Sequence, residues 1–184
     1  MKILKIIGIV VVVLVVLFFG VAMFLPSSVH VERSLVLPAS SELIYNEIID
    51  LRQWHKWSPW HQQDPDMTIT YDGSFKGEGA SYRWTSDKVG NGSLTIIEAR
   101  PYQYIATDLK FMEQGQATGY YRFESIDEAT IVTWGFETNM GQTPIAKYMG
   151  LMMDNMVGSD FEHGLQRLKT HIQSLQPKTA ATET

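Results

Sequence analysis

Residues 130–138 read TIVTWGFET and residues 145–176 read IAKYMGLMMDNMVGSDFEHGLQRLKTHIQSLQ, and the change of hydrophobic period between them decides the fold. In the first stretch Val132, Trp134 and Phe136 recur at every second position, which is typical of a strand. In the second stretch the apolar residues recur at helical spacing. One stripe of this helix is expected to hold Ile145, Met149, Met152, Met156, Leu165, Leu168, Ile172 and Leu175.

The two-residue period extends upstream from Thr138 to about Met67, in short segments that turn residues separate. The predicted strands cover 67–71, 80–85, 94–100, 102–111, 118–126 and 130–138. Turns are expected at 73–79, 91–92, 115–116 and 127–128. Upstream of this meander, residues 29–37 suit a strand, and Ser40 or Ser41 begins a helix that runs to about Asp50. A short helical piece over 51–57 follows and is ended by Pro59.

This order of elements predicts an α+β domain in which a curved antiparallel sheet of about six or seven strands holds the long C-terminal helix. Each layer has one apolar face to bury, so the two are expected to pack together. The chain of 184 residues suits one such domain with an appendage. We expect an anchor over residues 1–25, the domain over 26–176 and a disordered polar tail over 177–184.

Residues 6–25 form an apolar run without a charge, long enough for a helix to cross a bilayer. Lys2 and Lys5 precede the run, which predicts a single-pass membrane protein with a cytoplasmic N-terminus and a domain on the far, periplasmic side. A cleaved signal peptide is the alternative, because Gly20-Val21-Ala22 has the spacing of a cleavage site. Residues 23–25 continue the apolar run and favour the uncleaved anchor.

The composition restricts the partners and the chemistry. The net charge is −5, and the anchor carries only Lys2 and Lys5, so the domain itself is more acidic still. Such a domain disfavours nucleic acid as a partner. The sequence has no cysteine, which excludes disulfides, thiolate metal sites and cysteine nucleophiles. No metal and no cofactor is expected, because no metal-binding spacing connects His30, His55, His61, His163 and His171.

No catalytic residue is assigned from the sequence, since no serine stands in a G-x-S-x-G motif. An acid–base enzyme would need a carboxylate or a histidine inside the fold. The ionisable candidates by position are Arg83, Glu98, Asp108, Arg122 and Glu137. Alternation places Arg83 and Glu137 outside, and a solvated face is expected for all five.

The residues between Trp54 and Trp84 resemble a known superfamily. Trp54-His55-Lys56-Trp57-Ser58-Pro59-Trp60 is followed by Asp64-Pro65, Tyr71-Asp72-Gly73 and Gly77-Glu78-Gly79, and then by Tyr82 and Trp84. These segments are similar to those of bacterial members of the START/Bet v 1-like (SRPBCC) superfamily, which includes polyketide cyclases/dehydrases and lipid-transport proteins. The resemblance covers about residues 29–175 and implies a helix-grip fold with an internal cavity. It implies no single reaction, because members bind, carry, cyclise or regulate.

The expected cavity lies between the sheet and the long helix. Alternation predicts that its sheet side is lined by Ile69, Tyr71, Tyr82, Trp84, Leu94, Ile96, Val132, Trp134 and Phe136, joined by Tyr121 and Phe123. Flexible side chains are expected to form the opposite wall, namely Met149, Met152, Met153 and Met156. A plain packed core would use the same residue types.

Trp54, Trp57 and Trp60 recur at spacing three in the loop after the first helix of the domain. They predict a lid over the cavity mouth, a contact with the membrane interface, or a plug that closes one end of the sheet.

Three functions remain open from the sequence. The first is a membrane-anchored binding protein for an apolar or amphipathic small molecule, lipid or polyketide-like, in the internal cavity. The second is a cyclase/dehydratase-type enzyme that uses the same cavity. The third is a ligand-free regulatory or interaction module that binds a protein partner through the tryptophan loop.

Overall fold

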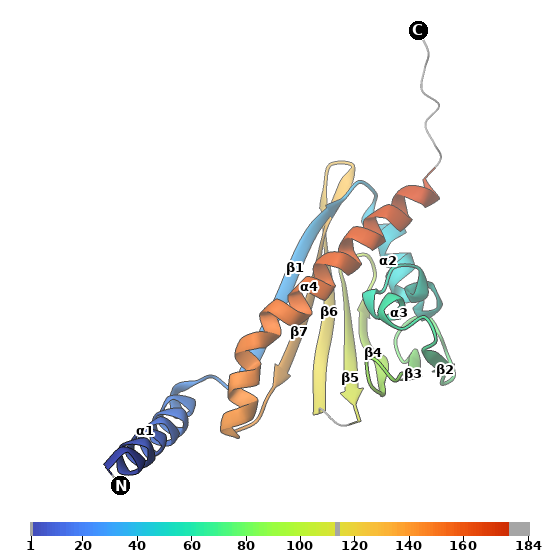
Figure 1. The fold of residues 1–184 in the computed structure, drawn as a ribbon. Helices are drawn as coiled ribbons and strands as arrows, with labels where there is room; N and C mark the ends of the chain where they lie inside the picture. Colours follow the sequence, from blue (N-terminus) through green and yellow to red (C-terminus); the bar gives the residue numbers. More distant parts are fainter. Residues whose placement is uncertain (1, 113–114, 177–184) are drawn as a thin grey trace.

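The computed structural model describes residues 2–112 and 115–176, which form one antiparallel sheet, a long helix across it, a group of short helices and an apolar N-terminal helix (Figure 1). The helices are α1 (Lys2–Phe24), α2 (Ser41–Ile49), the 3₁₀ helix η1 (Leu51–Lys56), α3 (Pro59–Gln63) and α4 (Pro144–Leu175). The strands are β1 (Ser28–Leu37), β2 (Thr68–Tyr71), β3 (Ser81–Thr85), β4 (Gly92–Arg100), β5 (Tyr104–Phe111), β6 (Gly115–Ile126) and β7 (Ala129–Asn139). The tail expected over 177–184 lies outside the described residues.

The seven strands are ordered β1-β7-β6-β5-β4-β3-β2, and every pair is antiparallel. Strands β2 to β7 form a continuous meander, and β1 joins it at the far side by pairing with β7. A bulge between Ile96 and Glu98 interrupts the register of β4 with β5, and bulges bend a sheet. The predicted helix-grip architecture of strand, short helices, meander and long helix is confirmed.

The strand register separates an apolar inner face from a polar outer face. On the inner face Ile105 lies opposite Tyr121 and Tyr121 opposite Trp134, and this row ends at the charged Arg33 on the edge strand β1. The neighbouring row places Ala106 opposite Tyr120, on the other face. The period of two that the sequence displays is therefore the alternation between these two faces.

Helix α4 is held to the inner face by its C-terminal half. The Phe161 ring stacks on Trp134, with ring centroids 4.4 Å apart and planes at 14°. Gly164 allows this approach, because a Cβ there would lie 2.5 Å from Cζ3 of Trp134. Leu165 and Leu168 continue the buried stripe toward the end of the helix.

The apolar residues of α4 do not form the single stripe that the spacing predicts. The buried stripe is Phe161, Leu165, Leu168 and Ile172, whereas Ile145, Met149, Met152 and Met156 are exposed. The reason is helical phase: Met156 and Leu165 are nine residues apart, which is about two and a half turns, so they lie on opposite faces. The first and second halves of α4 therefore carry two apolar stripes on opposite faces. Each stripe has the three- and four-residue spacing of a helix, so the two appear as one stripe when only the spacing between neighbouring apolar residues is considered.

The short helices pack against the inner face of the sheet, where Trp54 contacts Tyr82 and Tyr121, and against α4, where Trp60 contacts Phe161. Of the two serines that the sequence offered as a cap, Ser40 caps α2 by accepting a hydrogen bond from the Leu43 amide at 3.4 Å. Pro59, expected to end a helical piece, instead occupies the first turn of α3, where its missing N–H costs nothing.

We predict that Gly164→Ala destabilises the fold by about 1–3 kcal/mol, although alanine is the better helix former, because the added methyl group would overlap the rigid Trp134 ring. Chemical denaturation followed by tryptophan fluorescence measures the change. The matched control is Ser159→Ala, at an exposed site on the same helix, where a change within about 0.5 kcal/mol is expected. Equal stability of the two variants would contradict the described approach of α4 to the sheet.

Candidate functional site

The sheet residues predicted to line a cavity come together on the inner face. Nine of these eleven side chains are buried, while Ile69 is half-buried and Tyr71 is exposed. Both exceptions belong to β2, the short strand at the edge of the sheet. The structure therefore assembles the predicted set on one surface, and its role in binding a ligand stays a prediction.

The tryptophan loop enters the interior instead of standing free in solvent. Trp54 and Trp57 are fully buried, and Trp60 is partly buried against the core. The indole N–H of Trp54 donates to the Ile48 carbonyl at 2.8 Å. Trp57 contacts Trp134 at a centroid distance of 5.6 Å. These side chains pack between the short helices, the sheet and α4.

Two polar atoms in this interior have no hydrogen-bond partner among the described residues. They are the hydroxyl oxygen of Tyr121 and the indole nitrogen of Trp57. The two rings belong to one cluster, with centroids 6.2 Å apart and planes nearly perpendicular. Two further such atoms, Nδ1 of His61 and Nε of Arg167, belong to α3 and α4. Buried polar groups in native proteins are nearly always paired, so each exception needs an explanation.

Aromatic rings surround the Tyr121 side chain. Its ring packs on Trp134 at 5.1 Å and on Trp54 at 5.9 Å. Burial raises the pKa of the Tyr121 hydroxyl well above its ordinary value, with a smaller contribution from Tyr82. The hydroxyl is therefore neutral at any physiological pH and able both to donate and to accept one hydrogen bond.

The methionines predicted as the opposite wall lie elsewhere. Met149, Met152 and Met156 are exposed on the face of α4 that points away from the sheet, and only Met153 is partly buried against the core. Phe161 and Leu165 occupy the position opposite the sheet that was expected for the methionines. The sequence could have predicted the burial of Phe161, because Phe161 precedes Leu165 by four residues and so lies on the same face of the helix.

The five ionisable candidates lie on the outer face. Arg83 pairs with Asp72, Glu98 with Arg100, Asp108 with Lys110, Arg122 with Glu32, and Glu137 with His30. The inner positions of β3 to β7 carry no Asp, Glu, His, Lys or Arg within the described residues. On β1, Arg33 faces α4 and is neutralised there by Asp154 and Glu162.

A polar network on the outer face was not anticipated from the sequence. The Tyr120 hydroxyl donates to Glu32 at 2.7 Å, and the Arg122 guanidinium donates to the same carboxylate oxygen at 2.7 Å. The Tyr120 hydrogen bond is the main cause that lowers the pKa of Glu32. Tyr120 lies across Gly135, where any Cβ would overlap its ring. Adjacent tyrosines thus have opposite environments, with Tyr120 hydrogen-bonded outside and Tyr121 unpartnered inside.

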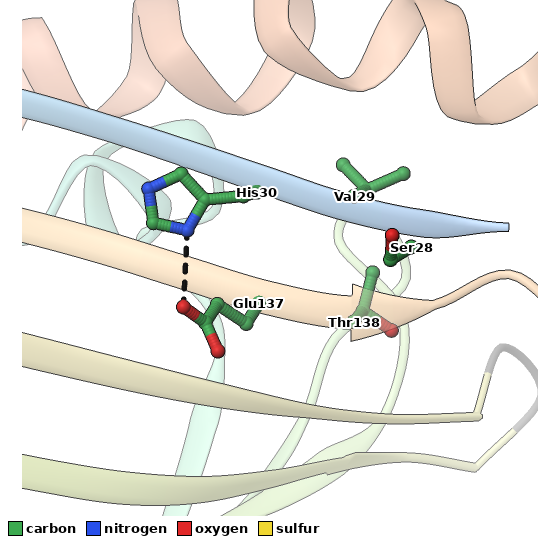
Figure 2. Close-up of a pocket in the computed structure, with 5 residues that line it drawn as sticks. All are labelled: Ser28, Val29, His30, Glu137 and Thr138. Carbon is green, nitrogen blue, oxygen red and sulfur yellow. Dashed lines mark hydrogen bonds and ion pairs between the residues drawn. The ribbon is translucent and has the colours of Figure 1, made fainter. Parts of the chain in front are cut away.

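A shallow concavity of about 440 Å³ lies at the start of β1 and the end of β7. It is lined by Ser28, Val29, His30, Glu137 and Thr138, and His30 Nδ1 lies 3.0 Å from Glu137 Oε1 (Figure 2). None of its lining residues belongs to the predicted cavity. The side chains of His30 and Glu137 are more than half exposed.

Within residues 2–112 and 115–176, no group of three or more histidine or carboxylate side chains could hold a metal ion.

Solved structures with this fold differ widely in sequence. DynU16, from the dynemicin biosynthetic locus, is 14% identical with a TM-score of 0.57 over 80% of this chain, which spans only 48% of DynU16. SA2116 from Staphylococcus aureus, a protein of unknown function, is 14% identical with a TM-score of 0.63, over 80% of this chain and 94% of its own. Ara h 8.0201 is 11% identical with a TM-score of 0.56, over 80% and 99%. At such identities the likeness concerns the fold alone.

Similarity in sequence identifies the family. No curated protein matches the chain. The family model for polyketide cyclase/dehydrase and lipid transport matches residues 28–173, from the first strand of the domain to the last turns of α4. The match covers well over half of the chain, and the helix-grip fold agrees with it. The chain therefore belongs to the polyketide cyclase/dehydrase and lipid-transport family.

Proposed function

We propose that this protein is a membrane-anchored binding domain that holds an apolar or amphipathic small molecule, lipid or polyketide-like, against the inner face of its sheet. The family and the helix-grip fold support a ligand-binding domain. The aromatic interior around Tyr121 and Trp57 supports the location of the site. The polar atoms of these two residues support a ligand that carries at least one oxygen able to accept a hydrogen bond.

The unpartnered Tyr121 hydroxyl is the observation that carries the proposal. A buried hydroxyl without a partner costs about 1–3 kcal/mol. A domain that needed only a filled core would gain by placing phenylalanine there, because phenylalanine keeps the ring contacts with Trp54 and Trp134. A ligand oxygen that accepts from Tyr121, and from the Trp57 indole, accounts for both polar atoms.

The distribution of charge favours binding over acid–base catalysis. A cyclase or dehydratase needs a titratable group beside its substrate, and the candidates named from the sequence are paired on the outer face. Trp54 and Trp57 are buried, so of the three tryptophans only the partly buried Trp60 leaves any aromatic surface for a protein partner. The interior is therefore the part of this molecule best suited to recognise something.

The anchor is α1, whose 23 residues are long and apolar enough to cross a bilayer by length and composition, as a signal sequence also would be. We place the N-terminus in the cytoplasm because of Lys2 and Lys5, and the domain on the far side of the membrane. An uncleaved α1 is supported by its contact with the folded domain: Phe18 stacks on Tyr148 of α4, at 4.7 Å and 17°. A segment removed after export has no need of such a contact.

We predict that Tyr121→Phe raises the free energy of unfolding of the ligand-free protein by about 1 kcal/mol, because it removes an unsatisfied polar group and keeps the ring. The adjacent Tyr120→Phe is the control. It removes the hydrogen bond to Glu32 and should lower the free energy of unfolding by about 1 kcal/mol, since the pair is partly exposed. Urea denaturation in detergent micelles measures both. Destabilisation by Tyr121→Phe would show that the hydroxyl has a partner within the protein.

Native mass spectrometry of the full chain, released from detergent micelles, tests the binding itself. We expect a small-molecule adduct on the wild-type protein and on Tyr120→Phe, with a clearly smaller adduct fraction on Tyr121→Phe. All three proteins carry the same α1, so lipid that merely adheres to the anchor cannot produce a difference between them. An adduct that is absent from the wild type, or equal in the two variants, argues against the interior as the site.

A further inference from the structure

The first half of α4 carries an apolar stripe that the fold does not bury. Ile145, Met149, Met152 and Met156 are each more than half exposed, on the helix face opposite to the buried one. They span about 16 Å along the helix. The only charged residues between Pro144 and Val157 are Lys147, which is buried, and Asp154, which pairs with Arg33.

The same exposed face becomes polar in the second half of α4. Ser159, His163, Gln166 and Thr170 are exposed there, and no large exposed apolar side chain appears again before Leu175. One helix therefore presents an apolar surface at its start and a polar surface farther on. A gradient of this kind along a single face indicates that the two halves meet different media.

The apolar half of α4 is the half that contacts α1. The Tyr148 ring stacks on Phe18, and the Tyr148 hydroxyl donates to the Phe18 carbonyl at 3.1 Å. Ala22, one turn farther along, is the one buried residue of α1. Figure 1 shows the start of α4 beside α1 and the end of α4 far from it.

The position of Phe18 sets a depth for this contact. Phe18 precedes Leu25, the end of the apolar run, by seven residues, or about 10 Å along a helix. If α1 crosses the bilayer, Tyr148 reaches below the membrane surface on the side of the domain. Amphipathic helices that lie in the interface bury their apolar face about 5–10 Å deep, and tyrosine favours that level.

We propose that the first half of α4, from Ile145 to Met156, lies in the lipid interface, with its apolar stripe inserted among the acyl chains. This surface has lipid as its partner, and apolar insertion does not depend on anionic headgroups, in keeping with the acidic domain. The proposal rests on the membrane anchor in the proposed function and not on the bound ligand. It fixes the domain on the membrane with the β1 start and the β7 end nearest the lipid.

Spin labels on the full chain test this placement, and the absence of native cysteine makes every label unique. The variants are Met149→Cys, Met152→Cys and Met156→Cys, with Gln166→Cys on the same helix as the water-exposed control and Leu14→Cys in α1 as the membrane control. Each is reconstituted into phosphatidylcholine vesicles. Power saturation then compares collisions of the label with oxygen, which concentrates in lipid, and with a water-soluble nickel complex.

The expected ratio of oxygen to nickel accessibility is several-fold higher at positions 149, 152 and 156 than at 166, and close to that at 14. If the ratios at positions 149, 152 and 156 resemble that at 166 while position 14 lies in lipid, the placement of α4 is wrong and the anchor is correct. A water-exposed position 14 overturns the anchor together with this placement. Labels shielded from both reagents and broadened by neighbouring spins show contact between two copies of the chain, which also overturns the lipid contact.

Discussion

The stacking of Phe161 on Trp134 is the contact on which the arrangement of the domain depends. It joins the last helix to β7, the strand next to the β1 edge of the sheet, and Gly164 beside it allows the two rings and the helix backbone to come together. Trp57 also contacts Trp134, edge to face, and connects the same cluster to the short helices. One aromatic cluster therefore holds the sheet, the short helices and α4 together.

This cluster also determines what the interior can do. Its rings leave the Tyr121 hydroxyl and the Trp57 indole nitrogen without partners. The charged residues of β3 to β7 lie on the outer face, where the Tyr120 hydroxyl and the Arg122 guanidinium both donate to Glu32. An interior of apolar surface with a few neutral hydrogen-bonding groups suits recognition of an apolar or amphipathic molecule.

Alternation made most of the fold and one wall of the site predictable. Residues at every second position, such as Val132 and Trp134, share a face in any strand, so the inner set could be named without coordinates. The residues of α4 that face the sheet could not be named in this way. Met156 and Leu165 are nine residues apart, which is about two and a half turns, so they lie on opposite faces of the helix although each follows the local apolar spacing. The lack of a partner for the Tyr121 hydroxyl could not be predicted either. Alternation predicts which face of the sheet a residue occupies, but not which groups of other elements contact it.

A ligand that completes the hydrogen bonding of the interior would be visible in a crystal structure of the full chain isolated with its co-purified small molecule. We expect density for that molecule on the inner face of the sheet, with an oxygen atom at hydrogen-bonding distance from the Tyr121 hydroxyl. Density for the molecule elsewhere, with the Tyr121 hydroxyl bonded to another protein group, would show that the interior is not the binding site.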